Sequence, residues 1–186
     1  MKTPDLVFRG RRLSRDRALV LAAVESLPAA RSAVADGADL VSFPGSLVAQ
    51  ARETFPGLVI GVDTADPSVA AACCEAGADL ILARADLAEV AARYNAGYAA
   101  PVVPSVPGLS VVVDIGEFRS MPSEDVPVLA SVAGDGTPGG LALAALAASA
   151  GVAIIRTKHV RQVRHVAEMA ASIAGTRPPA KAVRWE

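Results

Sequence analysis

The stretch LVIGVDTADPSVAAACCEAGADLILA, residues 58–83, decides the fold. It opens with a short apolar run at residues 58–62, typical of strands that are covered on both faces in a parallel sheet. Asp66 then stands where a helix N-cap accepts hydrogen bonds from the backbone, and Pro67 suits the first helical position. An alanine-rich segment follows and stops at Gly77, before a second apolar run. The stretch therefore predicts one strand–helix–strand unit.

The same phrase recurs along the chain. VADGADLVSF, CEAGADLILA, YNAGYAAPVV and ASAGVAIIRT each pass from a helix-like segment through glycine into an apolar run. Eight strands are expected in all, at residues 19–24, 39–43, 58–62, 78–83, 99–103, 110–113, 126–131 and 153–157. Eight parallel strands alternating with helices indicate a TIM-type (β/α)8 barrel.

Two of the connections are too short for a complete barrel. Only PSVPGL separates the fifth and sixth strands, and only IGEFRSMPSED separates the sixth and seventh, whereas a parallel crossover usually needs a dozen or more residues. We therefore expect an α/β fold, a reduced barrel that lacks helices near strands 5–6 and 6–7. Either neighbouring strands pair antiparallel there or one of these runs is a loop. A three-layer open sheet is the alternative architecture.

Composition limits the classes of function. A chain of 186 residues, 52% hydrophobic, suits a single domain over residues 1–186. Its net charge of −1 provides no global basic field for nucleic acid or an anionic membrane, and no apolar run reaches the ~20 residues of a membrane span. The adjacent Cys73 and Cys74 have neither disulfide nor metal-ligand spacing, which favours a reduced, cytoplasmic protein.

Several phrases together resemble a known family. FRGRRLSRDRALVLAAV, AVADGADLV, GVDT, CEAGADLI and IIRTKHV, in this order, are similar to dihydropteroate synthase, and especially to its atypical second paralogue. The resemblance is strong at both ends and in the centre of the chain, and weak over residues 100–135. It implies a pterin-binding (β/α)8 barrel of folate biosynthesis. That enzyme joins dihydropterin pyrophosphate to p-aminobenzoate and releases pyrophosphate, commonly with Mg²⁺.

The resemblance also implies site residues. Asp63 in GVDT and Asp114 in VVVDIG match pterin-contacting aspartates, although a strand-end aspartate could instead cap a turn. Arg156 matches an arginine that holds pyrophosphate, and Lys158 replaces the family's histidine on the same strand face; a salt-bridged strand end is the alternative. Glu25 replaces an asparagine and could ligate Mg²⁺.

Other positions depart from the family pattern. The mobile loops after the first two strands are deleted, the fourth-strand asparagine and aspartate become Leu82 and Ala83, and Asp135 stands where a pterin-contacting lysine belongs. No catalytic residue can be assigned. We therefore expect a truncated, catalytically impaired homologue that keeps part of a pterin or small-phosphate pocket. An active dihydropteroate synthase and a partner-binding scaffold without ligand are the alternatives.

The strands beside the two short connections lack covering helices, and this predicts that another chain binds there. Strand side chains alternate faces, and the outer face of a barrel needs a cover. We expect a homodimer through the valines of this flank: Val102, Val103, Val111, Val113, Val126 and Val128.

The last helix should bury one stripe of side chains and expose a basic face. Apolar residues recur there at helical spacing, which predicts a stripe made of Val160, Val163, Ala167, Ala170 and Ile173. Arg161, Arg164 and His165 lie outside this stripe and are interpreted as a solvated face.

Overall fold

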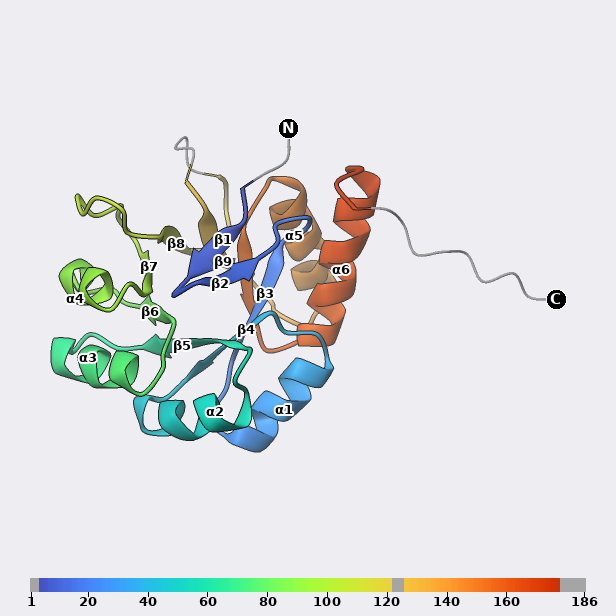
Figure 1. Ribbon diagram of the computed structural model, residues 1–186. Helices are drawn as coiled ribbons and strands as arrows, with labels where there is room; N and C mark the ends of the chain where they lie inside the picture. The colour runs from blue at the N-terminus through green and yellow to red at the C-terminus, as the bar shows by residue number, and fades with distance from the viewer. Residues whose placement is uncertain (1–3, 122–125, 178–186) are drawn as a thin grey trace.

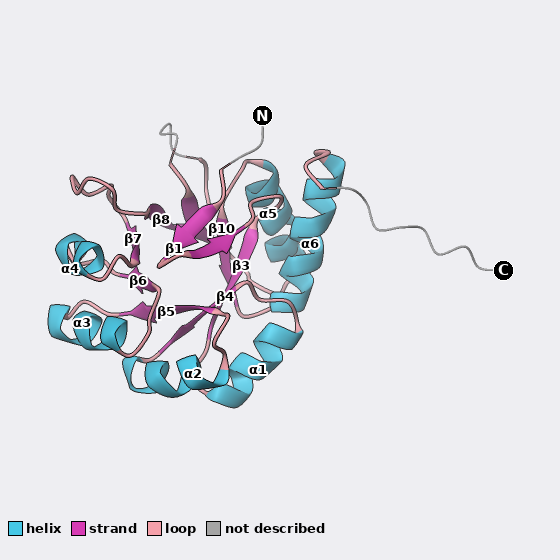
Figure 2. Ribbon diagram, viewed as in Figure 1, coloured by secondary structure: helices cyan, strands magenta, loops and turns pink. Residues whose placement is uncertain are grey.

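The computed structural model describes residues 4–121 and 126–177, and its main body is a closed barrel of eight parallel strands (Figures 1 and 2). The strands follow each other in the order β10–β3–β4–β5–β6–β7–β8–β9. Their bounds are β3 Leu19–Ala23, β4 Leu40–Phe43, β5 Val59–Asp63, β6 Leu80–Leu82, β7 Gly97–Ala100, β8 Val111–Glu117, β9 Val128–Ser131 and β10 Ile154–Thr157. The barrel is confirmed, and the open-sheet alternative is wrong because β10 pairs with β3.

Six α-helices cover the barrel in the described part of the chain. They are α1 Leu27–Ala35, α2 Val48–Thr54, α3 Pro67–Glu75, α4 Ala88–Arg93, α5 Pro138–Ser149 and α6 Val160–Ile173, and a 3-10 turn, η1 Gly45–Leu47, precedes α2. The first turn of α3 forms as expected, since the Asp66 carboxylate accepts hydrogen bonds from the backbone amides of Ser68 and Val69. The expected gap is also present: among the described residues between α4 and α5, Figure 1 shows no helix.

The two short connections do not reverse the chain. β7 pairs parallel with β8, and β8 pairs parallel with β9, so the expectation of antiparallel pairing or of a missing strand there is wrong. The fifth strand also ends earlier than expected, at Ala100, which leaves Val102 and Val103 in the following loop. No helix forms between Pro101 and Ser110, as predicted.

The outer face of this flank is covered mostly by the chain itself. Val128 is fully buried and Val113 is only 7% exposed, so the expected need for a second chain over these valines is not met. Partly buried side chains in and beside the two connections pack against the outer core cluster, to which Val128 belongs: Val106, Leu109, Ile115, Phe118 and Met121. The large apolar residues that do stay exposed here are Val102 and Val103.

An N-terminal hairpin that the sequence analysis did not predict lies across one end of the barrel. Strands β1 Leu6–Phe8 and β2 Arg11–Leu13 pair antiparallel about a tight turn in which Arg9 and Gly10 both have positive φ. Leu6 and Phe8 join the barrel's inner cluster, and Phe8 occupies the place that a side chain at Gly97 would need. The hairpin therefore plugs the amino-terminal end of the barrel, leaving the carboxyl-terminal end for a site.

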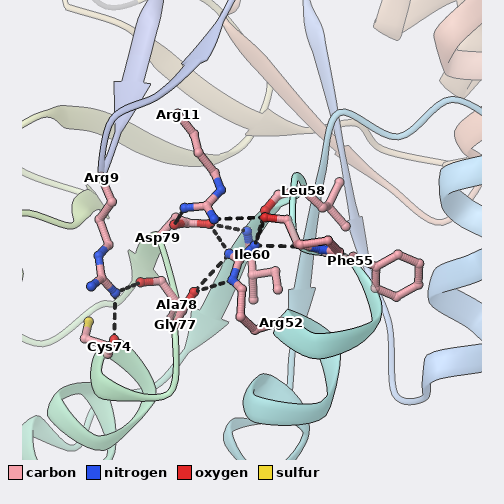
Figure 3. A network of polar contacts seen from close by, with 11 residues as sticks. Arg9, Arg11, Arg52, Phe55, Leu58, Ile60, Cys74, Gly77, Ala78 and Asp79 are labelled. Atoms are coloured by element: carbon pink, nitrogen blue, oxygen red, sulfur yellow. Dashed lines mark hydrogen bonds and ion pairs between the residues drawn. The ribbon is translucent and has the colours of Figure 1, made fainter.

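Arginines fasten this plug to the barrel (Figure 3). Asp79 is fully buried at the start of β6, where its Oδ1 accepts a hydrogen bond from Arg11 Nη1 at 2.7 Å. Its Oδ2 accepts from Arg52 and from the amide of Ile60. Arg9 adds hydrogen bonds to carbonyl oxygens at the end of α3. Because a buried carboxylate is costly unless fully paired, this network holds the hairpin in one place.

Helix α6 buries nearly the stripe expected of it. Val160, Val163, Ala167 and Ala170 are buried, but Ile173, the last residue of the helix, is 80% exposed and Ala171 is buried instead. The basic face is only partly solvated. Arg164 is ion-paired with Asp39 and with Glu168, and the exposed Arg161 is ion-paired with Asp36. His165 is exposed.

The two cysteines are buried in α3, are unpaired, and pack as small core residues. Burial raises the pKa of the Cys74 thiol to about 11, so this thiol stays protonated and weakly reactive near neutral pH. No helix among the described residues is long and apolar enough to cross a bilayer.

Candidate site at the barrel mouth

A cavity of about 220 Å³ opens at the carboxyl-terminal ends of the strands. It gathers residues from four places around the barrel, which lie on or just after β5, β6, β8 and β10. Its lining consists of Asp63, Thr64, Ala65, Leu82, Ala83, Arg84, Asp114 and Arg156. Since side chains alternate along each strand, Asp63, Asp114 and Arg156 follow interior residues by two and so point into the mouth.

The interior below the cavity is apolar. Val59, Leu82, Val112 and Ile154 belong to one buried cluster with the plug residues. Gly61 lies beneath Asp63, and an added Cβ there would come within 2.9 Å of Leu82 Cδ1. The polar layer therefore rests on a closed apolar floor, so charges at the mouth meet water only from above.

Asp114 and Arg156 are held together across the mouth. Arg156 Nη2 donates to Asp114 Oδ2 at 3.1 Å, and the amide of Gly116 donates to Asp114 Oδ1 at 2.9 Å. The register of β8 shifts between Asp114 and Glu117, and Gly116 has φ of 68°, so a bulge aims this amide back at the carboxylate. The pair is thus oriented before any ligand arrives.

The other predicted site residues lie elsewhere. Lys158 is exposed beyond the end of β10 and does not line the cavity. Glu25 is exposed just before the N-cap Ser26 of α1, and no group of three or more His, Cys, Asp or Glu suited to a metal occurs in the described ranges. The structure therefore brings together Asp63, Asp114 and Arg156, and leaves Lys158 and Glu25 outside.

Asp135 is engaged in a local structural role. Its carboxylate accepts hydrogen bonds from Thr157 Oγ1 at 2.6 Å and from the amide of Lys158 at 2.7 Å. It thereby fixes the turn between β10 and α6 instead of facing the cavity.

Comparisons with known proteins agree with this architecture. The chain is similar to the Mycobacterium tuberculosis structure Rv1207, with 28% identity and a TM-score of 0.80 over 96% of this chain and 100% of that chain. A Coxiella burnetii dihydropteroate synthase in complex with pteroic acid is 16% identical, with a TM-score of 0.76 over 94% of this chain and 100% of that one. No protein-family model matches the chain.

A curated relative is similar over a shorter stretch. Inactive dihydropteroate synthase 2 of Mycobacterium leprae is 56% identical over 46 residues, which are 25% of this chain and 16% of that protein. The chain therefore shares the fold of dihydropteroate synthases and is similar in sequence to one such protein over this stretch. The match thus spans much less than two thirds of the curated family member.

The cavity contains residues that match the dihydropteroate synthase pattern and residues that depart from it. Asp63, Asp114 and Arg156, which match the family pattern, all line it, and so do Leu82 and Ala83, which break that pattern with apolar side chains. The connection from β3 to α1 is only residues 24–26, and Pro44 alone separates β4 from η1, so both expected loop deletions are confirmed.

Arg84 lines the cavity but was missed in the sequence analysis. None of the stretches that carry the family resemblance includes it. The signal that could have found it is a charged side chain placed directly after the apolar run of β6.

Proposed function

We propose that this chain is a catalytically impaired dihydropteroate synthase homologue that retains a pocket for a pterin or a related heterocycle. The observation that carries the proposal is the convergence of Asp63, Asp114 and Arg156 on one cavity at the barrel mouth. Solved relatives from Coxiella burnetii and Yersinia pestis hold pteroic acid and a pterine–sulfa conjugate, which supports this class of ligand.

The two aspartates suit the N–H edge of a pterin. A carboxylate offers only acceptors, and a 2-amino-pyrimidinone ring presents adjacent donors. Asp63 has no hydrogen bond or ion pair to any described residue, so its oxygens are free to accept. Asp114 keeps acceptor capacity beyond its bonds to Arg156 and Gly116 and is already oriented by them.

The same cavity is poorly equipped for catalysis. Displacement of pyrophosphate needs cationic groups aimed at the departing charge, and the charge of Arg156 is already shared with Asp114. Lys158 lies outside the cavity, and the connections after β3 and β4 are too short to close over a substrate. Water therefore has free access to any cationic intermediate, and Arg156 is not free to hold pyrophosphate.

Binding and turnover test this proposal separately. At 100 times its dissociation constant, a ligand should stabilise the native state by about 2.7 kcal/mol, a clear thermal shift for a chain of this size. We expect such a shift with 6-hydroxymethylpterin and its loss in Asp63→Asn and Asp114→Asn. Glu53→Gln, an exposed change on α2, is the control and should keep the shift.

Release of pyrophosphate that depends on p-aminobenzoate should stay at background, with or without Mg²⁺. Robust multiple turnover by the purified protein would contradict the impairment and favour the active alternative. If no pterin changes the melting temperature, the pocket does not serve this ligand class.

We further propose that the protein acts as a homodimer through α5 and α6. Helix α5, PGGLALAALAAS, carries no charged residue, yet Leu146 on it is 61% exposed. Met169 and Ile173, one turn apart on the neighbouring α6, are 53% and 80% exposed. A helix that is apolar all round is normally buried, and a two-fold axis lets one such surface bury itself.

A further inference from the structure

A cavity of about 170 Å³ lies at the amino-terminal end of the barrel, away from the mouth. It is lined by the segment before β3, by the end of α5 and the segment after it, and by the last turns of α6. Helices α5 and α6 lie side by side here, over the seam where β10 pairs with β3 and closes the barrel (Figure 1). The cavity therefore lies where the beginning and the end of the barrel-forming chain meet.

Small side chains leave this space between the helices. Ala167, Ala170 and Ala171 of α6 line it and are buried, and so is Val152 before β10. The lining of an unfilled space loses the van der Waals contacts that a packed interior provides. The cavity therefore suits an occupant with one apolar ring.

Two helix ends give the cavity its polarity. The carboxyl ends of α5 and α6 both line it, and the last carbonyl groups of a helix have no partner within the helix. Such ends favour N–H donors and positive charge. Among the charged residues that line the cavity, Arg17 is paired with Asp39, and the neighbours Arg15 and Asp16 have opposite charges. The occupant should therefore carry an N–H donor, with a cationic group beside it.

The chain leaves α6 at the rim of this cavity. Gly175 has φ of 72° and turns the backbone at the end of the helix. Thr176 lines the cavity, and its hydroxyl donates to the carbonyl oxygen of Asp16 at 2.9 Å. Arg177 Nη1 lies 2.6 Å from Glu168 Oε1. These contacts fix the point from which residues 178–186 continue.

The segment that follows has the matching chemistry. Residues 178–186, PPAKAVRWE, lie outside the described residues and carry Trp185, the one tryptophan of the chain, with Lys181 and Arg184 before it. An indole ring has a large apolar surface and a single N–H donor. Two prolines carry a chain only about 6 Å away, and the next six residues can return over as much as about 20 Å. The segment is therefore long enough to bring Trp185 back to the cavity beside Thr176.

We propose that residues 178–186 bind back on the chain as a strap, with Trp185 in the cavity between α5, α6 and the segment before β3. The strap fastens the last helix to the strand that opens the barrel, across the seam of β10 and β3. This role is independent of any ligand at the mouth.

Tryptophan fluorescence tests the strap, because Trp185 is the only source of this signal. Its emission should lie at a shorter wavelength in the native protein than in urea, and acrylamide should quench it severalfold less. Ala174→Phe and Ala148→Phe fill the cavity from positions that are not fully buried, and each should restore the emission and quenching seen in urea. Ala72→Phe, an exposed change on α3 outside the cavity, should leave both unchanged.

Two measurements locate the ring and its effect. Nuclear Overhauser cross-peaks should connect the indole of Trp185 to the methyl groups of Ala170 and Ala171. Trp185→Ala should lower the melting temperature by about 4 °C or more, because a buried aromatic side chain is lost.

Three results would overturn the strap. The first is a native emission equal to that in urea, or quenching that both cavity-filling variants leave unchanged. The second is the absence of the cross-peaks to Ala170 and Ala171 in the wild type. The third is an emission that moves to the wavelength seen in urea on dilution, because Trp185 would then be buried by a second copy of the chain.

Discussion

Two aspartates in the repeated phrase GADL perform the same task at two places in the barrel. Asp39 accepts hydrogen bonds from the amide of Val20 on β3 and from Arg17 and Arg164. Asp79 repeats this pattern with the amide of Ile60 on β5 and with Arg11 and Arg52. The repeat seen in the sequence is therefore also a repeated joint, in which one carboxylate fastens the preceding parallel strand and two guanidinium groups.

Replacement of Asp79 by asparagine should show the strength of this joint. The change leaves two partly buried guanidinium groups without their charge partner, and we expect a loss of about 3 kcal/mol in the free energy of unfolding, the usual cost of breaking a buried pair. Urea unfolding followed by circular dichroism measures it. Glu117→Gln, which breaks the exposed pair with Arg119, should cost less than about 0.5 kcal/mol. Equal costs for the two variants would contradict a structural role for the joint.

Individual residues also show which parts of the site could be predicted from the sequence. Asp63, Asp114 and Arg156 could be placed at one mouth because each directly ends an apolar run, and parallel strands end together. Lys158 could not, because β10 stops at Thr157 and strand alternation no longer applies beyond it. The pairing of Asp114 with Arg156 depends on a barrel closed across β8, β9 and β10, which spacing alone leaves open.

At the scale of elements, the helix-free connections explain why antiparallel pairing was the wrong expectation. β7 has four residues, so the chain must travel back only about 13 Å to start a parallel neighbour, at 3.3 Å per residue. The ten residues at 101–110 can span more than twice that distance when extended. A helix rises only 1.5 Å per residue, so the usual dozen or more residues are the requirement of a helix and not of the crossover itself.

The connection after β7 should therefore contribute to stability as a helix would. Leu109→Asp places a charge where a partly buried leucine packs against the outer core, and we expect a loss of about 1–3 kcal/mol. Val102→Asp, at a side chain that is 74% exposed in the same connection, should change the free energy of unfolding by less than about 0.5 kcal/mol. Thermal unfolding of the two variants decides between a packed connection and a loose loop.

Helix α6 should give a measurable pH dependence through Glu168. Burial alone would raise the pKa of this carboxyl, but hydrogen bonds and positive charge from Arg177 and Arg164 outweigh it and lower the pKa to about 2. A lowered pKa in the folded state means that the ionised form stabilises the protein above the ordinary value of 4.5, and that this stability is lost as the pH falls toward 2.

The variant Glu168→Gln tests this dependence. It should be less stable than wild type by about 1 kcal/mol near neutral pH, a modest cost because the pair is partly open to water. The difference should shrink between about pH 4.5 and 2. A difference that stays constant across this window would rule out the charge of Glu168 as its cause.

At the scale of the whole molecule, periodicity predicted the barrel, but the cover of its outer face could not be read from the sequence. An apolar strand flank without helices indicates only that something must bury it. Here Val106 and Leu109, in the connection after β7, pack against the outer core, and exposed apolar side chains lie on α5 and α6 instead. The hydrophobic pattern of the sequence shows how much apolar surface must be buried. Which segment covers each face depends on the paths of the loops, and the pattern does not specify these.

The remaining exposed surface leads to the prediction of a dimer. Helix α5, Pro138–Ser149, has no charged residue, and its Leu146 is exposed. Exposure of this apolar surface to water is unfavourable. Light scattering at micromolar concentration should give twice the 18.9 kDa of one chain. Leu146→Asp should shift the protein to monomer with an unchanged circular dichroism spectrum, because burying two aspartates across a two-fold axis is costly.

Val69→Asp on α3, at a side chain that is 41% exposed, should leave the dimer intact. A wild-type monomer at 18.9 kDa, or equal dissociation by both changes, would reject the α5–α6 interface.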